Sequence, residues 1–74
     1  MDEIMEDILL KLLIYKVENG EKWVDTEILK LKLKHHENEI EECITSLENN
    51  GLIERNEESI RITREGIDFI IQRV

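Results

Sequence analysis

The chain has 74 residues, of which 41% are hydrophobic and 38% are charged, and its formal net charge is −8. This length fits one domain near the lower limit for a self-sufficient core, and with three aromatic residues that core must be mostly Ile and Leu. Periodic apolar residues exclude a disordered acidic chain, and no apolar run approaches the roughly 18 residues of a membrane span. One cysteine cannot form an internal disulfide, and the N-terminus is acidic where a secretory signal is basic. We expect a single soluble domain over residues 1–74, located in the cytoplasm.

The first predicted helix runs from Asp2, a suitable N-cap, to Asn19, and Gly20 ends it. At 100° per residue its core face is one broad stripe: Ile4, Met5, Ile8, Leu9, Leu12, Leu13 and Tyr15. Three further apolar residues fall outside that stripe and need a partner: Leu10, Ile14 and Val17. Residues 21–24 are then predicted to be short and extended.

The second predicted helix covers residues 28–34 and is capped by Asp25 or Thr26. Its leucines alternate with lysines, which is the period of a strand, but Leu29, Leu33 and Ile40 have the +4, +7 spacing of a helix-turn-helix core. His35 and His36 are expected to be turn residues or a helix cap. The third predicted helix spans residues 37–50, stops at Gly51, and has a core face of Ile40, Cys43, Ile44 and Leu47.

A hairpin and a last helix complete the predicted fold. Residues 52–55 and 59–62 are expected to pair as strands around a turn at 56–59, with Ile53 opposite Ile60 or Ile62. Thr63 caps the last helix. The apolar stripe of that helix is Ile67, Ile70, Ile71 and Val74, and Phe69 lies off it. The three glycines are interpreted as helix or turn punctuation.

Residues 47–53 (LENNGLI), followed by residues 62–66 (ITREG), are similar to the helix-to-wing passage of MarR- and ArsR-type transcription regulators. The resemblance covers roughly residues 4–74. It implies an α+β winged helix-turn-helix domain with a three-helix core, a two-stranded wing, a short third strand and a C-terminal helix. In that family the third helix enters the major groove and the wing reaches a neighbouring groove or backbone.

The charge of this chain opposes that mode of DNA binding. Residues 35–59 contain eight Glu and one Arg, so seven of the eight excess negative charges lie there. Each carboxylate near a phosphate is repelled by a few tenths to roughly 1 kcal/mol, whereas DNA affinity normally comes from cations. We therefore predict a regulatory module, linked to transcription or DNA metabolism, whose third helix and wing contact a basic protein. The predicted contact residues are Glu39, Glu41, Glu42, Thr45, Ser46, Glu57 and Glu58.

Two other functions remain open. The first is a DNA-binding repressor that uses Lys30, Lys32, Lys34 and the wing arginines, with a nucleic-acid rim at Lys32, Lys34, Arg55 and Arg61. The favoured interpretation of these cations is that they are solvated residues and local partners of nearby Glu, and a rim contact to nucleic acid is the alternative. The second is an acidic inhibitor whose carboxylates mimic DNA. A titration with random duplex DNA separates the repressor from both acidic alternatives.

Catalytic, cofactor and metal sites are not predicted. The chain has neither a Ser/His/Asp arrangement nor a glycine loop for phosphate, so we do not expect an enzyme or a cofactor. His35, His36, Glu39 and Cys43 are metal-ligand types, but Cys43 falls on the core face and no zinc site is expected.

The spare apolar residues of the first and last helices predict either that these helices cover each other or that they form a homodimer interface. The residues concerned are Leu10, Ile14, Val17 and Phe69.

Overall fold

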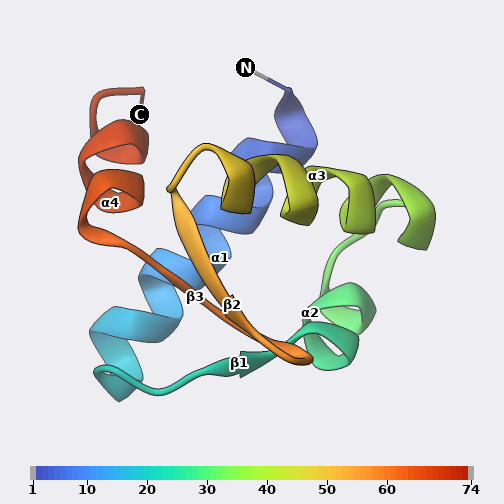
Figure 1. Cartoon of the computed structure of the whole chain (residues 1–74), viewed down its shortest axis with the longest axis horizontal. Coiled ribbons are helices and arrows are strands. Elements are labelled where there is room, and N and C mark those ends of the chain that lie inside the picture. The colour runs from blue at the N-terminus through green and yellow to red at the C-terminus, as the bar shows by residue number, and fades with distance from the viewer. Residues whose placement is uncertain (1, 74) are drawn as a thin grey trace.

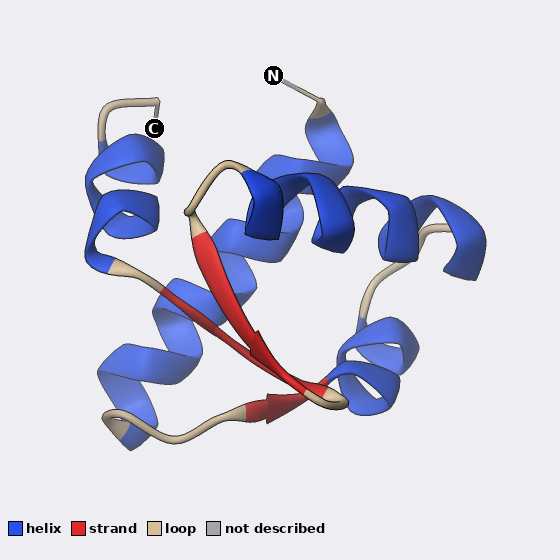
Figure 2. Cartoon of the chain, viewed as in Figure 1, coloured by secondary structure: helices blue, strands red, loops and turns tan. Residues whose placement is uncertain are grey.

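The chain runs through α1 (Glu3–Asn19), β1 (Val24–Asp25), α2 (Thr26–Lys32), α3 (Glu37–Asn49), β2 (Ile53–Asn56), β3 (Ser59–Ile62) and α4 (Arg64–Ile71). This is a computed structural model that describes residues 2–73. It is an α+β fold of four helices and a three-stranded antiparallel sheet. α1 lies behind the sheet and α3, with α2 and α4 on opposite sides (Figure 1). β2 and β3 cross the middle of the view in front of α1 and converge at the hairpin turn beside α2, and β1 lies below them (Figure 2).

Side-chain caps define where the helices begin. Asp2 Oδ1 accepts a hydrogen bond from the Ile4 amide at 2.8 Å, and Asp25 Oδ1 accepts one from the Glu27 amide at 2.8 Å. His36 Nδ1 accepts one from the Asn38 amide at 3.2 Å. Each bond satisfies a donor that the first turn leaves without an intrahelical partner. The predicted caps of α1, α2 and α4 are confirmed, and His36 takes the cap role foreseen for the histidine pair.

The ambiguous lysine–leucine segment is helical. Leu29 and Leu33 are buried with Ile40, whereas Leu31 is 85% exposed. Strand-like alternation would have placed all three leucines on one face. In a helix, Leu31 instead lies on a different face from Leu29 and Leu33. The spacing of Leu29 and Leu33 to Ile40, across the turn to α3, places these two leucines in the core.

The sheet has the order β1-β3-β2, so the last strand in sequence lies in the middle. Ile53 is opposite Ile62, one of the two predicted partners, and Asn56 is opposite Ser59. The hairpin loop is therefore Glu57-Glu58, and Glu57 has a φ of +57°. The Thr26 amide donates to the Glu58 carbonyl at 2.8 Å. That bond attaches the tip of the hairpin to the first residue of α2.

The core contains the buried apolar side chains of every element except β1. These are Ile4, Ile8, Leu9, Leu12, Leu29, Leu33, Ile40, Cys43, Ile44, Leu47, Ile53, Ile60, Ile62 and Ile70. The core residues predicted for α3 are confirmed. In α1 the predicted stripe was too broad, because Met5 and Leu13 are only partly buried and Tyr15 is half-buried at the rim.

The stripe predicted for the last helix was partly wrong. Ile70 is fully buried, but Ile71 is 55% exposed, and Val74 lies outside the described residues. Phe69, expected off the stripe, instead packs against the core. It lines a hollow with Met5, Leu47 and Leu52. The packing of Phe69 near the end of α3 therefore sets the rotation of this short helix about its own axis. Its buried face differs from the one that the spacing of its isoleucines predicts.

Gly66 lies inside α4, so interpreting it as punctuation was wrong. A Cβ atom there would lie 2.1 Å from the Leu52 carbonyl oxygen and 2.7 Å from Ile62 Cγ1. The Gly66 amide donates to Thr63 Oγ1 at 3.0 Å, and Thr63 Oγ1 donates to the Gly51 carbonyl at 2.7 Å. The Thr-x-x-Gly sequence thus joins the end of α3, the central strand and the start of α4.

Candidate functional site

The solvent side of α3 is the most acidic helical surface in the described chain. The helix contains five Glu and neither Lys nor Arg. Its core face is Ile40, Cys43, Ile44 and Leu47, so the intervening positions point outward. Asn38, Glu41, Glu42 and Thr45 line one open hollow of about 440 Å³. The structure thus brings together three of the predicted contact residues.

Glu41 is a structural residue as well as a surface one. Its carboxylate lies 3.2 Å from Lys30 Nζ of α2 and 2.8 Å from Arg55 Nη1 of β2, and Lys30 Nζ lies 3.6 Å from Glu27 Oε1. Partial burial alone would raise the pKa of Glu41, but hydrogen bonds from Arg55 and Lys30 outweigh it and lower the pKa. The hydrogen bond to Glu41 raises the pKa of Lys30. These two carboxylates and two cations form a network, the Glu41 network, whose charges balance.

Glu39 and Glu42 remain exposed, and no ion pair involves either of them within residues 2–73. The pKa of the nearby Cys43 thiol is raised first by burial and then by the charges of Asp2, Glu42 and Glu39. Asp2, which caps α1, and Glu39 and Glu42 on α3 are thus the carboxylates whose charge acts on the Cys43 thiol. Asp2 was not predicted here, because it lies 41 positions before Cys43 and only the packing of α1 on α3 brings it near that helix.

The other predicted contact residues have different surroundings. Thr45 is exposed on the same side as Glu42, whereas Ser46 is half-buried and its carbonyl accepts from Asn50 Nδ2 at 2.8 Å. Glu57 and Glu58 are exposed at the hairpin tip. That tip is held by the Thr26–Glu58 bond and by Arg55 Nε, which donates to the Glu57 carbonyl at 3.3 Å. The two glutamates are presented on a fixed turn beside α2.

Two of the four predicted rim cations are engaged inside the fold. Arg55 belongs to the Glu41 network, and Arg61 lies 4.3 Å above the Trp23 ring and 3.5 Å from Glu54 Oε1. Lys32 and Lys34 are exposed, and neither forms an ion pair in the described part of the chain. The cations that a DNA reader would direct at phosphates are therefore partly committed to intramolecular contacts.

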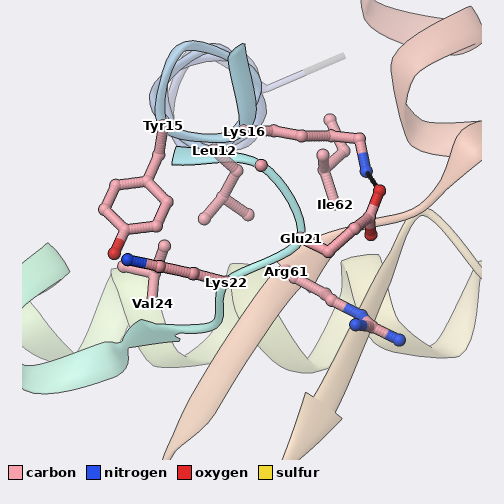
Figure 3. A pocket seen from close by; sticks show the side chains of 9 residues that line it. Leu12, Tyr15, Lys16, Glu21, Lys22, Val24, Arg61 and Ile62 are labelled. Carbon is pink, nitrogen blue, oxygen red and sulfur yellow. Dashed lines mark hydrogen bonds and ion pairs between the residues drawn. The ribbon is translucent and has the colours of Figure 1, made fainter. Parts of the chain in front are cut away.

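Arg61 also lines a crevice beneath the loop that follows α1 (Figure 3). Lys16 and Glu21 pair across its mouth, and this pairing lowers the pKa of Glu21. The volume is about 10 Å³, no more than one water molecule needs. The crevice is a packing feature rather than a ligand site.

The predicted dimer residues do not share one surface. Leu10 and Phe69 pack partly against the core of their own chain, whereas Ile14 is 53% exposed and Val17 78% exposed. Leu10 and Ile14 line a hollow beside α2, and Phe69 lines a different hollow beside the end of α3. The homodimer remains a prediction, with Ile14 and Val17 as its accessible residues.

Over residues 2–73, no three His, Cys, Asp or Glu side chains converge as metal ligands. No helix in that range combines the length and apolar character needed to cross a bilayer. Compared with protein families, curated proteins and solved structures, the chain has no significant match.

Proposed function

We propose that the chain is a winged helix-turn-helix module of the MarR/ArsR-like type that acts in transcription or DNA metabolism by binding a basic protein. The element order α1-β1-α2-α3-β2-β3-α4 supports the fold assignment. The pairing of β1 with β3 supplies the short third strand that the resemblance implies. In this assignment α3 is the recognition helix and the β2–β3 hairpin is the wing.

The Glu41 network is the observation that favours a protein partner over DNA. Within residues 2–73, Lys30 and Arg55 are the cations that form ion pairs with α3, and both pair with Glu41. Glu39 and Glu42 on the helix and Glu57 and Glu58 on the wing are then uncompensated. A fixed group of carboxylates attracts a cationic segment, accelerates its association and makes that association sensitive to salt.

Fluorescence anisotropy tests the proposal with two probes, a random DNA duplex and a labelled Lys/Arg-rich peptide. At low salt we expect no duplex binding tighter than about 10 µM, since the non-specific affinity of DNA-binding proteins depends on cations. We expect the peptide to bind, and its affinity to fall as salt rises. Tighter duplex binding that is lost when Lys32 and Lys34 are replaced by Glu would instead establish the DNA-binding repressor.

Charge reversal locates the contact. Glu39→Lys with Glu42→Lys should abolish peptide binding, because both side chains are exposed and outside the Glu41 network. Asp68→Lys on α4 makes the same change of charge per site elsewhere on the surface and should leave binding nearly unchanged. The double variant changes the net charge by +4 and the control by +2, so a loss of binding free energy in the control that is half as large or more would mean that net charge alone attracts the peptide, and the assigned surface would be wrong.

The DNA-mimic inhibitor makes a separate prediction. Its partner is itself a DNA-binding protein, so duplex DNA should displace the chain from that partner in competition. Displacement by duplex, combined with no direct duplex binding by the chain, supports the mimic. Simultaneous binding of chain and duplex supports the regulatory module.

A further inference from the structure

The sequence contains the dipeptide Asn-Gly twice, each time at the C-terminal end of a helix. Asn19-Gly20 ends α1, and Asn50-Gly51 follows the last residue of α3. All four residues are exposed, and the two glycines have nearly the same positive φ, +75° and +74°. In each pair the asparagine Nδ2 donates to the carbonyl four residues earlier. The two dipeptides therefore share their local structure and their access to water.

An Asn-Gly dipeptide can lose its side-chain amide without an enzyme. The glycine nitrogen forms a bond to asparagine Cγ, the Cγ–Nδ2 bond breaks, and a five-membered succinimide ring closes. Water carries the proton of the glycine nitrogen to the departing amide, which leaves as ammonia. A second water molecule then opens either carbonyl–nitrogen bond of the ring and leaves an aspartyl or an isoaspartyl residue. Glycine favours ring closure because it has no Cβ to obstruct it.

A closed helix end holds the reacting atoms apart. Asn50 has a ψ of 3°, which places the next nitrogen beside the backbone nitrogen of the same asparagine rather than beside Cβ. Ring closure needs rotation about the Cα–C bond, and this rotation breaks the hydrogen bond that the glycine amide donates to its helix. The acceptors are the Lys16 carbonyl for Gly20, at 2.8 Å, and the Glu48 carbonyl for Gly51, at 3.0 Å. The reaction therefore proceeds from conformations in which the helix end has opened.

The end of α3 is anchored to the rest of the fold. Leu47, in its last turn, is 1% exposed. The Gly51 carbonyl accepts from Thr63 Oγ1 at 2.7 Å, and the Leu52 amide donates to the Leu47 carbonyl at 3.0 Å. The Thr63 amide donates to the Leu52 carbonyl at 3.1 Å. Opening this end breaks apolar contacts and several hydrogen bonds at once, so it is costly.

The end of α1 lacks such anchors. Its last three residues are all exposed: Val17, Glu18 and Asn19. Within residues 2–73, no backbone–backbone hydrogen bond outside the helices and strands holds the Gly20 carbonyl or residues 21–22. Lys16 pairs with Glu21 across this loop (Figure 3), but a single surface ion pair contributes little. Helix ends of this kind open at a low cost in free energy.

We propose that Asn19 is a deamidation site of this protein and that the fold protects Asn50. The product has a carboxylate at the C-terminal end of α1, where the helix dipole disfavours negative charge. It also loses the hydrogen bond from Asn19 Nδ2 to the Tyr15 carbonyl, because a carboxylate has no donor. The modification thus adds one negative charge to a chain of net charge −8 and loosens the end of its first helix. It does not depend on the proposed function, since neither asparagine belongs to the predicted contact residues.

Peptide mapping of the whole chain tests the proposal. The chain is incubated in mildly alkaline buffer while circular dichroism verifies that it is folded, and it is then digested with trypsin and analysed by tandem mass spectrometry. Trypsin separates the two sites into residues 17–22 and 35–55. A sample taken at time zero corrects for conversion during digestion. We expect Asn19 to convert at least about tenfold faster than Asn50, which corresponds to a difference of about 1.4 kcal/mol in the free energy of opening.

The denatured chain is the matched control. In urea both dipeptides rotate freely, so their rates should be similar. In the folded chain, Asn19→Gln should remove most of the isoaspartate formed, whereas Asn50→Gln should leave the yield nearly unchanged. Thr63→Val removes the hydroxyl that binds the Gly51 carbonyl and should accelerate conversion of Asn50, with Asn19 in the same molecule as the internal reference. Thr63→Ser keeps the hydroxyl and should preserve the protection.

Three outcomes would overturn the proposal. The first is conversion of Asn50 in the folded chain at the rate of Asn19 or faster. The second is an equal preference for Asn19 in urea and in the folded chain, because the selectivity would then come from the sequence and not from the fold. The third is that neither asparagine converts in the folded chain over a period in which the denatured chain converts completely, since the end of α1 would then stay closed.

Discussion

Arg55 of β2 and Glu41 of α3 lie 2.8 Å apart, from Nη1 to Oε1, and this ion pair joins the hairpin to α3. Lys30 of α2 approaches the other oxygen of the same carboxylate at 3.2 Å. One side chain thus connects three elements. The same contacts that stabilise this arrangement remove two cations from the surface that a DNA reader would need.

Replacing Glu41 by Gln should lower the free energy of unfolding by about 1 kcal/mol. Two charge-assisted contacts are lost, but the side chain of Glu41 is 38% exposed, so solvent screening reduces their contribution. Urea denaturation measures the difference. Glu42→Gln, at the neighbouring exposed position, is the matched control and should change stability by less than about 0.3 kcal/mol. Equal effects at both positions would remove the structural role assigned to Glu41.

The stabilisation from this network should depend on pH at both ends of the scale. The pKa of Glu41 is lowered from 4.5, so its contribution is present above that value and is lost as the pH falls through the lower pKa of the folded state. The pKa of Lys30 is raised from 10.5, so its contribution is present below that value and is lost as the pH rises through the folded-state pKa. The stability difference between the parent and Glu41→Gln, measured against pH, should vanish in acid and shrink in strong base. A difference that persists unchanged at low pH would show that it does not come from the charge of Glu41.

Gly66→Ala should destabilise the fold by at least about 2 kcal/mol, because its Cβ would overlap the Leu52 carbonyl, a backbone atom that cannot rotate away. Gly51→Ala is the informative comparison. Gly51 has a φ of +74° but open space around it, so only the backbone penalty of about 1 kcal/mol applies. Thermal or urea unfolding of both variants should rank Gly66→Ala as the more damaging. The reverse order would mean that the α4–hairpin contact is looser than described.

Glu57→Gly should stabilise the protein by about 0.5–1 kcal/mol, because glycine adopts the positive φ of this position without the steric penalty of a Cβ. The same substitution at Glu58, which is not among the positive-φ residues, should instead destabilise through the greater freedom of the unfolded chain. Each variant removes one carboxylate from the hairpin tip, so comparing them separates the backbone effect from the charge effect. Stabilisation of equal size in both variants would indicate relief of charge repulsion.

The sequence by itself determined the order of the elements and most of the core. Caps such as Asp2 and Thr63, the stop at Gly51 and the helical spacing of Ile40, Cys43, Ile44 and Leu47 act over one or two turns, so they can be recognised without knowing what packs where. The hairpin follows from two short apolar strands around a polar turn. The excess of negative charge in residues 35–59 is also a property of the sequence alone.

Tertiary packing decided which of the spare apolar and charged residues are accessible. Phe69 turns inward and Ile71 outward because the neighbours of a short helix, rather than its own periodicity, select its buried face. Arg55 reaches Glu41 only because separate elements pack together. The open hollows that Ile14 lines likewise exist only where α1 and α2 lie side by side. Local patterns specify elements because backbone hydrogen bonds and side-chain periodicity are short-range, whereas a surface is assembled from residues that only the folded chain brings together.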